Sequence, residues 1–306
     1  MLTVCLFPPD FIKYILMRPY ITLMRPAHYV KNLLIFVPAV FAGAVFDHEI
    51  FIKCFFGFAA FCFVSSAVYI INDIFDAGSD RRHALKAARP IASGAIKVKN
   101  ALFLAAVLLL FGVGASTFAA PGPMPMLILA AYLVLNILYS ARLKNVPVLD
   151  LLILAAGFVL RVVYGGLISA AGVSDWLYLV IIMFAFFIGL GKRRAEIIGG
   201  AREARGVLKY YSESFLEKNM YACMTLTIVF YAMWCLDHTT VAAGKTVFNL
   251  IFTVPLVLVI FMRYLMRLES SAQGDPVEIV LKDKPLLLLI LLYAGLIVSI
   301  FIPCAL

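Results

Sequence analysis

Charged residues are scarce in this chain of 306 residues: Asp, Glu, Lys and Arg make up 14% of it, against about 25% in a soluble domain. Hydrophobic residues make up 64% of the chain. That leaves too little polar surface to cover a water-soluble globule of this size. The composition therefore excludes a cytosolic enzyme, a nucleic-acid-binding protein and a disordered protein.

Three further absences narrow the class of protein. Strict alternation of polar and apolar residues is missing, which argues against a transmembrane β-barrel. The six cysteines include no C-x-x-C pair and are predicted to be small buried hydrophobic residues, not a metal site or a disulfide framework. Met1–Pro9 has neither a positive stretch nor a small-residue cleavage site, so no cleavable signal peptide is expected.

Long apolar runs are what the chain does have. They approach 20 residues, the length at which a helix crosses about 30 Å of hydrocarbon. We therefore predict an all-α polytopic membrane protein that forms a single domain over residues 1–306, with an interfacial segment at 1–24. Nine transmembrane helices are expected, at residues 31–46, 51–74, 98–119, 124–141, 148–171, 174–192, 219–237, 246–267 and 285–304.

The net charge of +9 is unevenly distributed along the chain. Lys and Arg lie in the amino-terminal arm and after even-numbered spans, with the exceptions of Lys53, Lys245 and Arg161. By the positive-inside rule, that side is expected to face the cytoplasm. Two polar connections on this side, 76–97 and 192–218, are longer than simple connections need to be, and we expect them to be active-site loops.

The sharpest motif ends the second span. Asp73, Asp76 and Asp80 stand at i, i+3 and i+7 and share one face if the helix continues. Stacked carboxylates repel each other, and Mg²⁺ relieves the repulsion by accepting carboxylates, with phosphate oxygens completing its octahedron. With Asn72 assisting, these residues form the candidate metal site. The alternative is a solvated acidic helix end.

Basic residues follow the carboxylates directly. Arg81, Lys86 and Arg89 supply guanidinium and ammonium donors beside the candidate metal, the combination that binds pyrophosphate. A basic run near a membrane is also a common positive-inside feature. Its position next to three spaced aspartates favours the catalytic interpretation, whereas His83 alone is expected to be structural.

The fifth span carries a second polar stripe. Asp150 opens it, and Arg161 lies eleven residues further on the same face, about 16 Å deeper along the axis. A charge at that depth needs a partner inside the bundle. An ion pair and a ligand phosphate both remain open. Further candidate substrate-binding residues are Lys31, Tyr139, Lys144, Lys192 and Arg193.

Together these residues resemble a known family. Asn72-Asp73-x-x-Asp76-x-x-x-Asp80, at the end of the second span, resembles the first aspartate-rich motif of the UbiA superfamily of intramembrane prenyltransferases. More narrowly, the chain resembles the decaprenyl-phosphate phosphoribosyltransferase branch. The other matching stretches are 25–26, 31–38, 80–83, 89–94, 149–150, 156–161, 192–196, 274–276 and 283–284.

The resemblance implies a Mg²⁺-dependent transfer of 5-phosphoribose from 5-phosphoribosyl diphosphate (PRPP) to a polyprenyl phosphate. Many relatives that use a prenyl diphosphate carry a second motif of two aspartates four residues apart, but Leu154 stands four residues after Asp150. The alternatives are a prenyl diphosphate:aromatic acceptor transferase, a transporter or channel, and a structural membrane subunit. A homo-oligomer stays open, and nucleic acid is not an expected partner.

Overall fold

The computed structural model describes residues 18–82, 86–200, 206–237, 250–270 and 275–301. Most of these residues are helical, and none of them forms a strand. Eight of the helices are long and apolar enough to cross a membrane, so the chain is a multi-pass integral membrane protein, as predicted. They are α3 (His48–Asp80), α4 (Val98–Ala119), α5 (Pro123–Ala141), α6 (Leu149–Ser169), α7 (Asp175–Ile198), α8 (Glu213–Leu236), the span Leu250–Glu269 that contains α10 (Val254–Glu269), and α12 (Lys284–Phe301).

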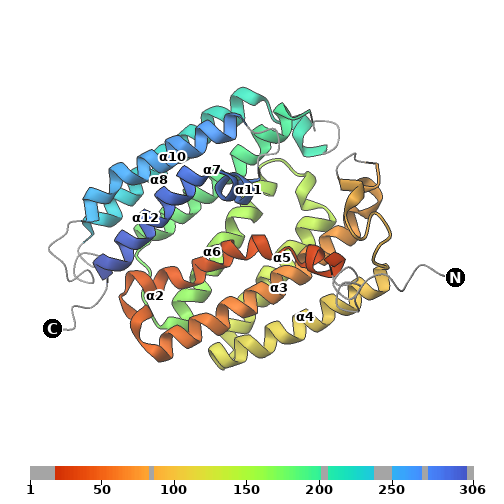
Figure 1. Ribbon diagram of the computed structural model, residues 1–306, viewed down its shortest axis with the longest axis horizontal. Coiled ribbons are helices and arrows are strands. Elements are labelled where there is room, and N and C mark those ends of the chain that lie inside the picture. The colour runs from red at the N-terminus through yellow and green to blue at the C-terminus, as the bar shows by residue number, and fades with distance from the viewer. Residues whose placement is uncertain (1–17, 83–85, 201–205, 238–249, 271–274, 302–306) are drawn as a thin grey trace, which may run out of the picture.

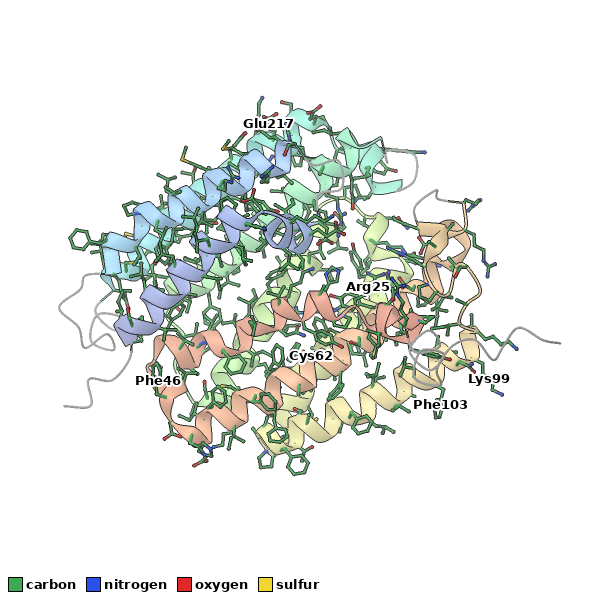
Figure 2. All side chains as sticks on the ribbon, viewed as in Figure 1. Arg25, Phe46, Cys62, Lys99, Phe103 and Glu217 are labelled. Atoms are coloured by element: carbon green, nitrogen blue, oxygen red, sulfur yellow. The ribbon has the colours of Figure 1, made fainter. Side chains whose placement is uncertain are left out.

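The helices form two groups that meet at α6. In Figure 1, α3 to α6 lie in one half of the view and α7, α8, α10 and α12 in the other, and α6 packs against both α3 and α7. Large apolar side chains also cover the outside of the bundle. Phe103 on α4, for example, is 72% exposed at the edge of the molecule (Figure 2). An apolar exterior of this kind suits contact with lipid.

The first predicted span is not a single helix. Residues Pro26–Phe36 form a 3-10 helix, η1, and Val37–Phe41 form the short α-helix α2. Pro38 has no N–H to donate to the turn before it, and Gly43 then turns the chain with a φ of 67°. The expected count of nine transmembrane helices is therefore not confirmed.

Both predicted cytoplasmic loops begin later than expected, because the helices that precede them, α3 and α7, are longer than predicted. The 33-residue helix α3 runs to Asp80 and is about 50 Å long, so it exceeds the hydrocarbon core of about 30 Å. Helix α7 continues to Ile198 and ends at Gly199 and Gly200, the latter with a φ of 77°. The interfacial segment 1–24 is helical at 18–24, and residues 1–17 lie outside the described part.

Candidate active site

The acidic motif lies in the last two turns of α3. All three aspartates are helical, as the spacing requires, and Asp73 and Asp80 are buried. The C-terminal end of a helix carries a partial negative charge, which adds to the mutual repulsion of carboxylates there. The site is therefore stable only with cations nearby, and other segments of the chain supply them.

Two arginines neutralise Asp73 and Asp80. Arg25, just before η1, donates from Nη2 to Asp73 Oδ1 at 2.5 Å. Arg89, in the connection after α3, bridges both carboxylates from Nη1, at 3.2 Å to Asp73 and 2.8 Å to Asp80. Figure 2 marks Arg25 close to the end of α3. The connection 81–97 is thus tied back onto the helix that precedes it.

Asp76 has a different set of partners. Lys144, in the short 3-10 helix η4 (Leu143–Asn145) after α5, forms an ion pair with its Oδ1. Asn72 Nδ2 donates to its Oδ2 at 3.1 Å, and Ser140 Oγ donates to Asn72 Oδ1 at 3.0 Å. Ser140 at the end of α5 therefore orients Asn72, and Lys144 in the η4 turn that follows holds Asp76.

These oxygen donors fit a magnesium ion that is bound together with a diphosphate. Within the described residues, no group of three acidic, histidine or cysteine side chains converges on one point. Mg²⁺ does not need such a cage, because it commonly takes one or two carboxylates and completes its shell with water and phosphate oxygens. Asp73 and Asp76 would hold it, and Arg25, Arg89 and Lys144 would turn from the carboxylates to the phosphates.

The end of α7 has the opposite charge. Lys192 lies 4.0 Å from Asp275, the residue that caps the short helix α11 (Pro276–Lys282). Burial alone would raise the pKa of Asp275, but the nearby charges of Lys192 and Lys31 lower it below its usual value. His28, also close to this group, has a buried Nδ1 that finds no hydrogen-bond partner among the described residues. The charges of two lysines thus act on one carboxylate, and Lys192 is the one in ion-pair distance of it.

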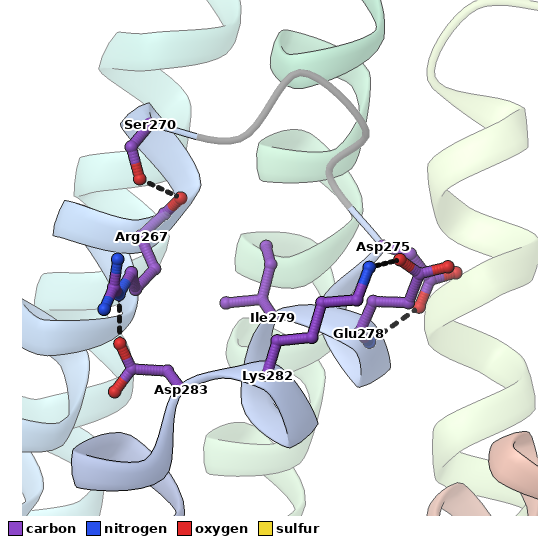
Figure 3. A pocket seen from close by; sticks show the side chains of 7 residues that line it. All are labelled: Arg267, Ser270, Asp275, Glu278, Ile279, Lys282 and Asp283. Carbon is purple, nitrogen blue, oxygen red and sulfur yellow. Dashed lines mark hydrogen bonds and ion pairs between the residues drawn. The ribbon is translucent and has the colours of Figure 1, made fainter.

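Asp275 also borders a pocket of about 250 Å³ between α10, α11 and the start of α12 (Figure 3). Its opposite wall is Asp283, which accepts hydrogen bonds from Arg263 and Arg267 and from the backbone N–H of Leu286. These contacts hold the pKa of Asp283 at about 2, and the Arg263 hydrogen bond is the largest cause. The polar network fixes α11, and Asp275 with it, between α10 and α12.

The side chains of Arg193 and Asp150 are more buried than that of Lys192, and they form an ion pair with each other. Arg193 Nε donates to Asp150 Oδ2 at 2.8 Å, and the two side chains are 1% and 0% exposed. The remaining contacts of Arg193 go to Glu196 at 2.8 Å and to the Tyr139 hydroxyl at 3.2 Å. The Tyr211 hydroxyl donates to Asp150 Oδ1 at 2.7 Å. The structure therefore brings three sequence-predicted substrate-binding residues into one buried ion-pair network.

Arg161 has no carboxylate within ion-pair distance among the described residues. Its guanidinium is 4% exposed and donates to Asn32 Oδ1 at 2.8 Å, to the carbonyl of Gly157 at 2.6 Å and to the Tyr132 hydroxyl at 3.0 Å. It also lies over the rings of Tyr132 and Phe61. Of the two partners left open by the sequence, the ion pair is therefore absent from this part of the chain.

Two predicted residues stand apart from the acidic site, and several members of the site were not predicted. Arg81 donates to the carbonyl of Ala92, and Lys86 is exposed on the 3-10 turn η3 (Lys86–Ala88). His83 lies outside the described residues. The members that had no role assigned from the sequence are Arg25, His28, Ser140, Tyr211 and Asp275. Arg25 and Asp275 lie in two of the stretches that resemble the family, 25–26 and 274–276. Arg25 and His28 had a signal, since they precede Lys31 at a spacing of three residues.

Comparisons with known proteins place the chain among transferases. The model of the UbiA prenyltransferase family matches residues 33–281. A decaprenyl-phosphate phosphoribosyltransferase from Corynebacterium glutamicum is 32% identical over 280 residues, which is 90% of this chain and 84% of that protein. One of the same name from Mycolicibacterium smegmatis is 30% identical over 285 residues, 89% of each chain.

Solved structures share the fold. A UbiA homolog from Archaeoglobus fulgidus bound to GPP and Mg²⁺ superimposes with a TM-score of 0.71 at 19% identity, and the match covers 92% of this chain and 99% of that one. The same homolog bound to DMAPP and Mg²⁺ gives a TM-score of 0.71 at 18% identity, with coverage of 92% and 98%. At this identity the likeness establishes the fold.

Proposed function

The chain belongs to the UbiA prenyltransferase family, and we propose that it transfers the 5-phosphoribosyl group of PRPP to a polyprenyl phosphate and releases diphosphate. The relatives from Corynebacterium and Mycolicibacterium, whose names state a phosphoribosyl transfer to decaprenyl phosphate, support this reaction because they align with nearly the whole chain. The donor is water-soluble, whereas the acceptor carries its phosphate on a hydrocarbon chain. Such a reaction belongs at the membrane surface.

The observation that carries the proposal is the opposite charge of the two helix ends. The end of α3 offers carboxylates, which suit a metal-bound diphosphate, and the end of α7 offers Lys192 with Lys31 nearby, which suits a phosphate held directly. Two anion-binding regions of different kinds match two phosphorylated substrates. A prenyl diphosphate:aromatic acceptor transferase has one phosphorylated substrate and needs only the first region.

The chemistry requires little of the protein beyond position and charge. An oxygen of the acceptor phosphate bonds to the anomeric carbon of ribose while the bond from that carbon to the diphosphate breaks, and the bonding electrons leave with the diphosphate. The attacking oxygen is ionised at neutral pH, so no general base is needed. Arg25, Arg89 and Lys144 stabilise the charge that develops on the departing diphosphate.

Magnesium, when bound by Asp73 and Asp76, supplies further positive charge to the leaving diphosphate. The side chains around it keep the two substrates in line and restrict water, which would otherwise capture the ribose cation. The positive-inside pattern of Lys and Arg supports a site that opens to the cytoplasm of the bacterial inner membrane. Soluble PRPP reaches the carboxylates from that side.

A direct assay tests the reaction. The purified protein in detergent receives PRPP labelled in the ribose, a polyprenyl phosphate and MgCl₂, and we expect a labelled lipid together with released diphosphate. Chelation of the metal should stop both. The Lys53→Ala variant is the control, because its exposed pair with Glu49 lies at the other end of α3. Turnover of only a prenyl diphosphate with an aromatic acid would disprove the proposal.

A further inference from the structure

The 3-10 helix η1 is long enough for positions three residues apart to form three distinct faces. Such helices have 3.0 residues per turn, so positions i and i+3 lie on one face, and runs longer than three or four residues are uncommon. This one has eleven residues, Pro26–Phe36. Its three faces differ in chemistry, and each face has its own surroundings.

One face is basic, one is packed and one is exposed. Arg25, His28 and Lys31 form a column that begins at Asp73 and ends near Asp275. The exposed face is Ala27, Val30 and Leu33. The packed face is Tyr29, Asn32 and Ile35, of which Tyr29 shares a hydrogen bond of 2.8 Å with Ser66 and the other two are buried.

The basic column depends on the 3-10 geometry. Arg25 precedes η1 and has a left-handed backbone with a φ of 54°, so the period applies to His28 and Lys31. At 3.6 residues per turn, three residues fall about 60° short of a full turn, so an α-helix would rotate Lys31 by about 60° from the direction of His28. Lys31 would then no longer point toward the charges of Asp275 and Lys192 that act on it in the present structure. The column that links the acidic end of α3 to the basic end of α7 thus exists only while η1 keeps its present turn.

Asn32 is the polar anchor of the packed face. Its amide nitrogen lies 3.3 Å from the Cys62 sulfur and 3.4 Å from Ser65 Oγ on α3, and its carbonyl oxygen accepts from Arg161 Nε on α6 at 2.8 Å. Figure 2 labels Cys62 midway along α3, beside η1. Asn32 therefore connects η1 to both neighbouring helices.

The backbone of η1 also touches α6 directly. A Cβ atom at Gly165 would lie 2.2 Å from the carbonyl oxygen of Ile35, so only glycine permits this approach. The Arg161 side chain, one turn earlier on α6, has three donors fixed by Asn32, Gly157 and Tyr132. Arg161 and Gly165 together form the surface of α6 on which η1 packs.

We propose that Arg161 is a positioning residue, which holds Asn32 and thereby fixes the register of η1 and the basic column on its other face. This inference rests on the proposed function for its kinetic readout and assigns Arg161 no contact with a substrate phosphate. The planar guanidinium reaches Asn32, Gly157 and Tyr132 at once. A lysine keeps the charge but not this fork of donors.

A double-mutant cycle separates positioning from phosphate binding. Asn32→Ala, Arg161→Ala, the double variant and Arg161→Lys are compared with the wild type for the KM and kcat of PRPP and of polyprenyl phosphate. We expect each single alanine variant to raise at least one KM about tenfold while kcat changes less. The KM of the double variant should be no higher than that of the more impaired single variant. Arg161→Lys should behave like Arg161→Ala, and Lys53→Ala like the wild type.

Two kinetic outcomes would overturn the proposal: multiplicative effects of the two alanine substitutions, and recovery of the KM by Arg161→Lys. Either would mean that Arg161 acts on the anion by its charge. The rise in melting temperature caused by inorganic phosphate, measured on the same proteins, gives a second readout without turnover. We expect it to shrink equally in both single variants and the double variant, and a further loss in the double variant contradicts positioning. If the wild type makes no labelled lipid, the proposed function fails while this readout still tests Arg161.

Discussion

The C-terminal ends of α3 and α7 both carry dense charge, but they are built in different ways. At α3, the partners of the aspartates come from Arg25, Arg89 and Lys144, whose side chains are 20–28% exposed. At α7, Arg193 is paired with Asp150, and both are almost completely buried. The first set of ion pairs is open to exchange with a ligand, whereas the second is closed.

This difference separates reactive charge from supporting charge. The cations at the α3 end are partly exposed and can turn to a phosphate while they keep access to water, although the carboxylates of Asp73 and Asp80 are themselves buried. Opening a buried pair leaves a charge without water or partner and costs several kcal/mol. We infer that the α3 end handles substrate and that Arg193 and Asp150 hold α6 against α7, which leaves Lys192 free to face the site.

The largest expected effect is the loss of turnover on removing a carboxylate of α3. Asp73→Ala and Asp76→Ala should each reduce kcat/KM by about 10³ or more, because the leaving diphosphate loses its magnesium. The melting temperature should stay close to that of the wild type, since the freed cations are partly solvated. The labelled-lipid assay and thermal unfolding in detergent measure the two quantities. Near-normal turnover of both variants would remove the metal assignment.

Asp150→Ala should have the opposite profile. The substitution leaves the Arg193 guanidinium buried without its main acceptor, and we expect a loss of about 3–5 kcal/mol in the free energy of unfolding. Unfolding in detergent at increasing denaturant measures this loss. Lys53→Ala is the matched control, because its exposed ion pair is worth about 1 kcal/mol or less. A fully stable Asp150→Ala with weakened substrate binding would place this residue in the substrate site instead.

The sequence predicted the fold class and the acidic motif because both follow from local patterns. Apolar runs define spans, and the spacing of Asp73, Asp76 and Asp80 lies within one helix. It did not predict the 3-10 helix, since the repeat of three in η1 is short and the run reads equally well as an apolar span.

Partners from distant segments were the other gap. Tyr211 is 61 residues from its partner Asp150 in the sequence, and Asp275 is further still from Lys192. Only folding brings these residues together, and no spacing in the sequence predicts it. That Arg193 binds substrate stays a prediction, and the structure shows its guanidinium paired with the buried Asp150. Basic residues after a span have the same appearance in the sequence whether they are buried or exposed. Burial decides between these roles, and it depends on helix packing that the local sequence does not encode.

The smallest expected effect concerns Asp275, the carboxylate beside Lys192 at the basic end. Asp275 caps α11 by accepting from the backbone N–H of Val277 and Glu278, and asparagine caps a helix about as well. Asp275→Asn therefore removes the charge while keeping the cap. Because the lysines lower the pKa of Asp275, its carboxylate stays ionised at every pH above the ordinary pKa of an aspartate. The ionised carboxylate then competes with a substrate phosphate for Lys192.

We expect Asp275→Asn to lower the KM of one phosphorylated substrate about threefold, a change of about 0.6 kcal/mol. The ratio of the variant KM to the wild-type KM should be the same at every pH between 6 and 8. Steady-state kinetics across that range measure it, and Glu278→Gln on the exposed side of α11 is the control. A KM that rises in Asp275→Asn would mean that the carboxylate orients the lysines for substrate, and the two helix ends would then both use their ion pairs as parts of the site.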